Sequence, residues 1–181
     1  MSTVITPATT RWAIDPAHSN VEFSVRHLMI ATVKGRFADV QGRVVFDHGD
    51  PSTAEVDVTL AAASIDTRMP QRDEHLRSAD FFDVRQFPNL TFRSRRVTVD
   101  GDDIKLVGDL TIRGITREVV LDVVSHGQQV DPWGQRKAGF EAKGKVKRSA
   151  FGLTWNQALE TGGVMVGDEV KLSIDVELVA Q

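Results

Sequence analysis

Apolar and polar residues alternate along most of this chain with a period of two. In the first clear run, Val21, Phe23 and Val25 fall on one face of an extended chain. The same alternation returns in seven later segments, which lie at residues 33–47, 56–60, 90–99, 104–112, 119–123, 140–147 and 170–176. Such alternation is typical of β-strands that bury one face and expose the other, as in antiparallel sheets. The pattern therefore predicts an all-β protein of eight strands.

Two of the predicted strands change phase partway along their length. The apolar phase changes from odd to even residue numbers near Ala38 and Asp39, and a second change occurs near Arg95 and Arg96. One extra residue at each point forms a β-bulge, and bulges bend a strand as a closing sheet requires. Turn-forming residues separate the strands at 47–51, 100–102, 113–114 and 131–134. Because closure removes exposed edges, the sequence predicts an eight-stranded antiparallel up-and-down barrel.

The interior of such a barrel is either filled by side chains or open to one small ligand. Gly42, Gly108 and Gly144 fall at inward positions between large apolar residues. Two interpretations stay open: the glycines relieve strand curvature at barrel corners, or they leave room for an apolar tunnel. The predicted lumen residues are Phe23, Val25, Phe37, Phe82, Phe92, Leu110 and Phe140.

A charged segment interrupts the strand pattern between the third and fourth predicted strands. It spans residues 67–88 and contains a helical turn after Pro70, a residue that suits the start of a helix. Connections this long usually carry structure or function in compact domains. The sequence predicts a short helical lid here, with Phe81, Phe82 and Phe87 plugging the barrel mouth.

The direction of the strands places other residues at the same rim. In an up-and-down barrel the odd-numbered strands all end on one side, which brings His27, Arg113 and Arg148 near the helical segment. A glycine-containing tract at 152–163 reaches this rim as well. Within it, Trp155 is predicted either to anchor a lid or to lie in an interface.

Length and composition limit the possible functions. With 181 residues the chain fits one domain, predicted at 11–181 after a flexible tail at 1–10. It has no cysteine, which excludes disulfides and thiolate metal sites, and its net charge of -3 argues against nucleic acid as a partner. No apolar stretch is long enough to span a bilayer and no leader is visible, so we expect a cytoplasmic protein without a membrane span.

Several motifs along the chain resemble those of the YceI-like family. They lie at residues 18–27, 64–68, 72–83, 87–92, 108–116 and 148–153, and the longest reads RDEHLRSADFFD. The resemblance covers residues 11–178. It implies a lipocalin-like barrel that binds a long-chain isoprenoid or similar amphiphile in its lumen without catalysis. It also implies a homodimer, and a periplasmic location in many members, although no leader is visible here.

A lipid in an apolar lumen gains about 0.8 kcal/mol for each buried CH₂ group, so specificity has to come from its head group. Arginine suits an anionic phosphate because its planar fork donates paired hydrogen bonds. The predicted head-group residues at the rim are His27, Arg72, His75 and Arg148. The alternative is that Arg72 pairs with Asp66 or Asp73 and only fastens the helix to the barrel.

Two other functions stay open. His27, Asp73 and His75 would serve a small metal-dependent or hydrolytic enzyme, since histidine and carboxylate side chains bind divalent metals and transfer protons. No metal-ligand spacing, nucleophile elbow or nucleotide-binding motif accompanies them, so we predict neither a metal site nor a cofactor. The third possibility is a filled barrel that acts only through its surface, as a dimer.

Overall fold

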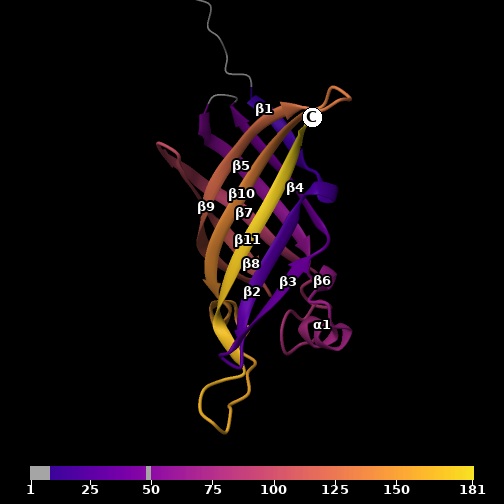
Figure 1. Cartoon of the computed structure of the whole chain (residues 1–181), viewed down its shortest axis with the longest axis vertical. Coiled ribbons are helices and arrows are strands. Elements are labelled where there is room, and N and C mark those ends of the chain that lie inside the picture. Colours follow the sequence, from indigo (N-terminus) through magenta and orange to yellow (C-terminus); the bar gives the residue numbers. More distant parts are fainter. Residues whose placement is uncertain (1–8, 48–49) are drawn as a thin grey trace, which may run out of the picture.

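The chain folds into one closed β-sheet, seen along its length in Figure 1. The computed structural model describes residues 9–47 and 50–181. Its strands in that part of the chain are β1 (Thr9–Ile14), β2 (Asn20–His27), β3 (Ala31–Phe37), β4 (Val40–Asp47), β5 (Asp50–Ala61), β6 (Ile65–Asp66), β7 (Asn89–Asp100), β8 (Asp103–Ile112), β9 (Ile115–Val130), β10 (Arg136–Lys147) and β11 (Val166–Ala180). Its helices are α1 (Pro70–Arg77) and the 3-10 turns η1 (Pro16–His18), η2 (Ala62–Ser64) and η3 (Arg148–Phe151).

Three of the barrel strands are interrupted, which is why the strand segments outnumber the strands of the barrel. β1 and β2 lie in line along β11, with η1 between them. β3 and β4 pair with β2 and β1 in turn, and β5 and β6 are separated by η2. When the two segments of an interrupted strand are counted as one, each barrel strand pairs antiparallel with the next one along the chain. β11, the last strand, closes the ring against β1 and β2. The predicted eight-stranded antiparallel up-and-down barrel is confirmed.

Both predicted phase changes coincide with irregularities in the sheet. Ala38 and Asp39 separate β3 from β4, so the strand pair breaks where the apolar phase changes. In β7 the register against β8 shifts at Arg95, which is the extra residue of a bulge. Of the turn predicted at 47–51, residues 48 and 49 lie outside the described residues.

The alternation pattern missed the first strand. β1 begins at Thr9, so the barrel starts two residues before the domain start predicted at residue 11. Trp12 and Ile14 are its buried residues, and η1 follows at once with Asp15 as its N-cap. A run with two buried positions is too short for a period of two to stand out.

The two ends of the barrel hold separate hydrophobic clusters. We call the end that carries α1 the lower end, and the opposite end, where β11 finishes, the upper end (Figure 1). The lower cluster consists of Phe37, Ala62, Ile65, Phe81, Leu90, Ile112, Val119, Phe151 and Leu153. The upper cluster consists of Trp12, Ile14, Val40, Phe46, Ala138 and Leu178. Leu60 packs against both clusters, so the two adjoin inside the barrel.

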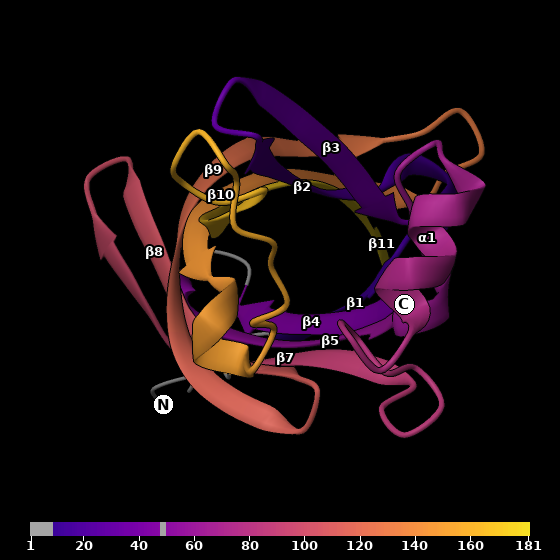
Figure 2. The same cartoon turned by 90° about the horizontal axis from the view of Figure 1, so that it is seen from below.

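The predicted helix is present between the third and fourth strands of the barrel. α1 starts at Pro70, which suits a first turn because its missing N–H has no partner to lose there. Seen from below, α1 lies at one side of the lower end, and the 152–165 loop between η3 and β11 passes across another part of it (Figure 2). No helix of the described residues has the length and apolar content needed to cross a bilayer.

Candidate functional site

An apolar cavity of about 490 Å³ lies inside the barrel. Most of its lining residues are aliphatic or aromatic and come from the inward positions of the barrel strands. The seven residues predicted for the lumen all line it, namely Phe23, Val25, Phe37, Phe82, Phe92, Leu110 and Phe140. Its volume falls within the roughly 300–1,000 Å³ that is usual for small-molecule sites.

The inward glycines are covered by neighbouring side chains. A Cβ on Gly108 would lie 2.5 Å from the ring of Phe92, and one on Gly144 would lie 2.6 Å from a methyl group of Leu121. Gly42 is covered in the same way by Ile14. These glycines therefore make room for the large side chains of Phe92, Leu121 and Ile14, and it is those side chains that line the cavity.

The two ends of the cavity differ in chemistry. At the lower end it is bordered by Leu76, Phe81 and Phe82 from the α1 segment, together with Arg148. At the upper end its lining includes polar residues near the strand ends, namely Asp47, Ser125 and Gln128. Of the predicted plug, Phe81 and Phe82 reach the cavity, whereas Phe87 packs against Gly114 in the β8–β9 turn.

Arg72 fastens the start of α1 to the chain that leaves β6. Its Nε donates to Thr67 Oγ1 at 2.7 Å and its Nη2 donates to the Thr67 carbonyl oxygen at 2.8 Å. The same Thr67 donates its backbone N–H to the buried Asp73 at 2.9 Å. The fastening role considered for Arg72 is thus present, but its partner is a threonine and not Asp66 or Asp73.

Arg148 is buried and holds the 152–165 loop. Its guanidinium donates to four backbone carbonyl oxygens, at 2.7 to 3.2 Å, on Leu153, Trp155, Val166 and Gly167. Burial lowers the pKa of Arg148 from its ordinary value, and the nearby Asp168 partly opposes that change. The side chain thus joins both ends of the loop, and it also borders the cavity.

Arg77 and Arg113 make contacts of the same kind. Arg77 donates to the carbonyl oxygens of Ala63 and Ile65, and Arg113 donates to that of Phe81 at 3.1 Å. Backbone carbonyls at the ends of strands and turns lack partners in the sheet, and the guanidinium fork can satisfy several at once. At the lower rim the arginines therefore act as crosslinks between loops. Arg77 was not among the predicted site residues.

His75 belongs to an aromatic cluster between α1 and the 152–165 loop. Its ring lies edge-on to Trp155, with centroids 4.7 Å apart, and to Phe81 at 5.1 Å. Its Nε2 is 2.8 Å from Asp80 Oδ2. Trp155 thus anchors the loop to the helix, which is one of the two roles predicted for it. His27 ends β2 at the same rim, opposite Val166 of β11.

The residues of the enzyme hypothesis have separate partners. Asp73 accepts hydrogen bonds from Thr67, His75 pairs with Asp80, and no described contact joins either of them to His27. The buried Asp73 carboxylate accepts the Thr67 backbone N–H, and the His75 ring packs against Phe81 and Trp155, so both side chains hold the structure together. The structure therefore assembles no acid–base pair from His27, Asp73 and His75.

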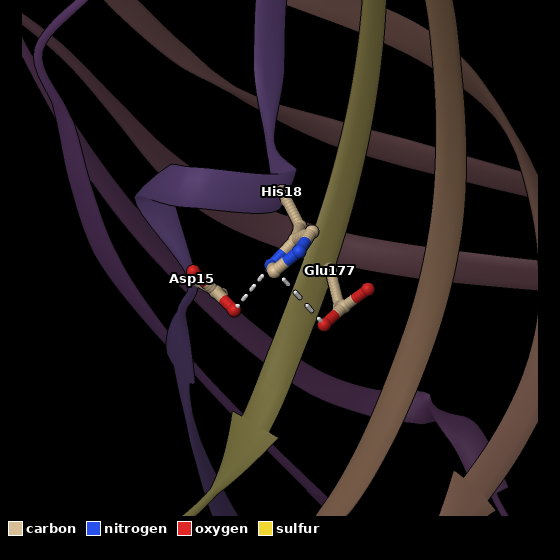
Figure 3. Close-up of side chains that lie close together, drawn as sticks. All are labelled: Asp15, His18 and Glu177. Atoms are coloured by element: carbon tan, nitrogen blue, oxygen red, sulfur yellow. Dashed lines mark hydrogen bonds and ion pairs between the residues drawn. The ribbon is translucent and has the colours of Figure 1, made fainter. Parts of the chain in front are cut away.

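A different group of metal-ligating residue types lies on the outside of the barrel (Figure 3). Asp15, His18 and Glu177 place their ligand atoms within 4.8 Å of one another. Lys137 Nζ lies 2.8 Å from Glu177 Oε1 and 3.4 Å from Asp15 Oδ2. The hydrogen bond from His18 holds the pKa of Asp15 below its ordinary value, and the hydrogen bond to Glu177 raises the pKa of Lys137. A divalent cation here would meet an ammonium group, so we interpret the cluster as an ion-pair network.

Comparisons with known proteins agree with this architecture. The sequence model of the YceI-like domain matches residues 12–178. Protein YceI of Escherichia coli is 42% identical over 164 residues, which cover 91% of this chain and 83% of that protein. Among solved structures, the Campylobacter jejuni YCEI protein superposes with a TM-score of 0.74 at 34% identity, covering 86% of this chain and 90% of the other.

A more distant structure shares the fold alone. It is described as a polyisoprenoid binding domain from Saccharophagus degradans, with a TM-score of 0.66 at 15% identity, and the match covers 94% of this chain and 98% of that one. The family match and the Escherichia coli relative each span most of the chain. The chain therefore belongs to the YceI-like domain family.

Proposed function

We propose that this protein is a non-catalytic carrier that binds a long-chain isoprenoid or a similar amphiphile inside its barrel. The observation that carries the proposal is the apolar cavity of about 490 Å³ inside the barrel. An apolar chain that enters such a cavity gains about 0.8 kcal/mol for each CH₂ group removed from water. The shared fold of the Saccharophagus degradans domain, described as polyisoprenoid binding, is consistent with this ligand class.

Head-group selectivity is expected to be weak. His27, Arg72, His75 and Arg148 stay our predicted head-group residues, but Arg72 and Arg148 already donate to oxygen atoms of the protein. A phosphate would have to compete with those contacts. We therefore expect a polyprenyl phosphate and the polyprenol of equal length to bind within about tenfold of each other, as measured by displacement of a fluorescent isoprenoid probe.

The test of the function itself is ligand retention and uptake. Mass spectrometry of an organic extract from the purified protein is expected to detect an apolar molecule, and the delipidated protein is expected to bind a polyprenyl probe. A protein that is empty and takes up neither polyprenyl nor acyl probes would contradict the carrier.

A blocking variant and its control locate the ligand. Ala142 is an inward residue of β10 that lines the cavity and pairs with Val123 and Ile174, which also line it. Ala142→Phe is expected to reduce probe uptake at least tenfold. Val124→Phe, on the exposed face of β9 next to Val123, is expected to leave uptake unchanged. Glycine variants are less suitable, because a Cβ on Gly108 would also meet the Arg93 carbonyl oxygen at 2.7 Å.

The oligomeric state and the cellular location of the protein are two further parts of the proposal. The homodimer stays a prediction that light scattering on the purified protein measures directly. The cytoplasmic location stays a prediction that cell fractionation measures.

A further inference from the structure

The turn between β2 and β3 exposes large apolar side chains at the lower end of the barrel. Met29 is 63% exposed and Ile30 is 79% exposed. Val164, in the 152–165 loop, is 41% exposed. Gly163, the residue before it, packs against the Met29 side chain. We call Leu28, Met29, Ile30 and Val164 the apolar tip. Isolated apolar residues on a surface are common, whereas several on one projecting tip mark an interaction site.

The apolar tip is held in a defined conformation. Leu28 and Met29 have φ angles of 51° and 62°, in the left-handed region that Asn and Gly adopt with little strain. The Leu28 N–H donates to the Met165 carbonyl oxygen at 2.8 Å, and Arg26 Nη2 donates to the Met29 carbonyl oxygen at 3.3 Å. A tight turn that uses Leu and Met in place of Asn and Gly accepts backbone strain at both residues and exposes the Met29 side chain. Neither choice helps the barrel to fold, which points to a role outside it.

The apolar tip adjoins the lower end of the cavity. Val25 of β2 and Val166 of β11 both line the cavity, and the chain runs from each of them to the tip within four residues. In Figure 1 the 152–165 loop extends furthest below the strands, and the β2–β3 turn lies beside the base of that loop. The lower end of the cavity is thus a few residues along the chain from the tip.

Cations line the outer face of the strands that carry the apolar tip. Register places Lys34 of β3, Ser24 of β2, Lys171 of β11 and Lys145 of β10 in one row across the barrel. Of the three exposed lysines in this row, only Lys145 lies within 4 Å of a carboxylate among the described residues, at 3.9 Å from Glu169. A groove between the lysines is also bordered by Glu22 and Asp122, so the row carries the positive part of a mixed surface.

The spacing between tip and row suits a lipid surface. Lys34 lies five residues beyond Met29, or about 16 Å along an extended strand. An apolar surface element enters a bilayer by about 5–10 Å. The lysine row would then stand within about a Debye length, roughly 8–10 Å, of the head groups. Apolar insertion and cationic attraction would therefore act together on an anionic bilayer.

We propose that the apolar tip inserts into an anionic lipid bilayer and that the barrel exchanges its ligand with the bilayer through its lower end. The exchange rests on the proposed carrier function, whereas the docking can be measured by itself. Trp133, which is 85% exposed in the β9–β10 turn of the upper end, offers a competing apolar anchor and therefore the matched control.

The experiment measures cosedimentation of the full chain with vesicles. The vesicles consist either of phosphatidylcholine alone or of equal parts phosphatidylcholine and phosphatidylglycerol. The wild-type chain is expected to bind the anionic vesicles more tightly, and added salt is expected to weaken that binding. Met29→Asn/Ile30→Ser is expected to weaken it by about tenfold or more, because the apolar side chains no longer leave water. Asn suits the left-handed turn, so this variant keeps the hairpin folded.

Two further variants separate the parts of the proposal. Lys34→Ala/Lys171→Ala is expected to remove most of the preference for anionic vesicles, and Trp133→Ser is expected to bind as the wild type does. Wild-type protein that fails to sediment with anionic vesicles, or a Met29→Asn/Ile30→Ser variant that sediments normally, would overturn the docking. Uptake of an isoprenoid probe added from ethanol without vesicles should be unchanged in the tip variant. A wild-type protein that also fails to take up the probe would instead contradict the carrier function.

Discussion

The two ends of the barrel are closed by different kinds of contact. At the upper end Trp12 stacks on Phe46 with centroids 5.5 Å apart, and Phe46 meets Phe140 edge-on at 6.3 Å. At the lower end hydrogen bonds from polar side chains add to the apolar contacts of the closing segments, with Arg148 on the carbonyl oxygens of the 152–165 loop and Asp73 on Thr67. Apolar packing within a sheet opens only when the barrel unfolds, whereas a loop held by hydrogen bonds opens locally. The difference supports the proposal that ligand exchange uses the lower end.

The largest effect is expected from breaking the upper cluster. Trp12→Ala removes a side chain that is 1% exposed and should lower the free energy of unfolding by about 3–5 kcal/mol. Trp12→Phe should cost less, about 1–2 kcal/mol, because it keeps a ring against Phe46 and the buried indole Nε1–H has no hydrogen-bond partner to lose among the described residues. Urea denaturation measures both. Equal losses in the two variants would mean that the indole nitrogen has a partner.

The next effect is expected from releasing the lower loop. Arg148→Met removes four hydrogen bonds and should lower the free energy of unfolding by about 2–4 kcal/mol. It should also expose the 152–165 loop to limited proteolysis, which Trp12→Ala should not do below its unfolding transition. Lys147→Met, at an exposed neighbour, is the control. A loop that stays resistant in Arg148→Met would show that Arg148 does not hold it.

A smaller effect is expected at the contact between the loop and α1. Trp155→Ala removes ring contacts with His75 and Phe81, each of about 0.5–1.5 kcal/mol. If this contact keeps the lower end closed, release of a bound isoprenoid probe should be about five- to tenfold faster in stopped-flow fluorescence. Trp133→Ala, at the opposite end, should release the probe at the wild-type rate. Equal acceleration in both variants would argue against exchange through the lower end.

The smallest effect concerns the ion-pair network beside β11. The folded pKa of Asp15 lies below its unfolded value, so its ionised form stabilises the fold above about pH 4, and this contribution is lost as pH falls through the folded pKa. Asp15→Asn should therefore melt slightly lower than the wild type near neutral pH, and the difference should vanish in acid. Asp175→Asn, an exposed change on β11, is the control. A difference that grows in acid would contradict the assignment.

Local sequence patterns were enough to predict the barrel and the residues facing its cavity. The period of two places each side chain on one face of its strand, and Arg95 and the pair Ala38–Asp39 mark where the phase changes. Pro70 and the length of the connection were enough to predict α1. These features depend on neighbours along the chain, and for that reason the sequence alone predicts them.

Partners at the rim could not be read in the same way. Arg148 contacts residues up to 19 positions away, and Lys137 reaches Asp15 across 122 positions. Which carbonyl or carboxylate an arginine or lysine meets depends on how the loops pack against the barrel. The sequence offered two acidic partners for Arg72, Asp66 and Asp73, whereas in the structure Arg72 donates to Thr67.

The apolar tip combines a feature that the sequence contains with one that only the folded chain shows. Leu28, Met29 and Ile30 form an apolar run at a turn without Asn or Gly, and that signal was present in the sequence. The exposure of Met29 and Ile30 became evident only in the folded chain, because an apolar run at a strand end is equally suited to a core. By itself the sequence determined the barrel, its inward faces and its helix, since these follow from periodicity along the chain. Only the tertiary structure decided which arginines are crosslinks, how the two ends close and where apolar side chains meet water, since these depend on contacts between distant segments.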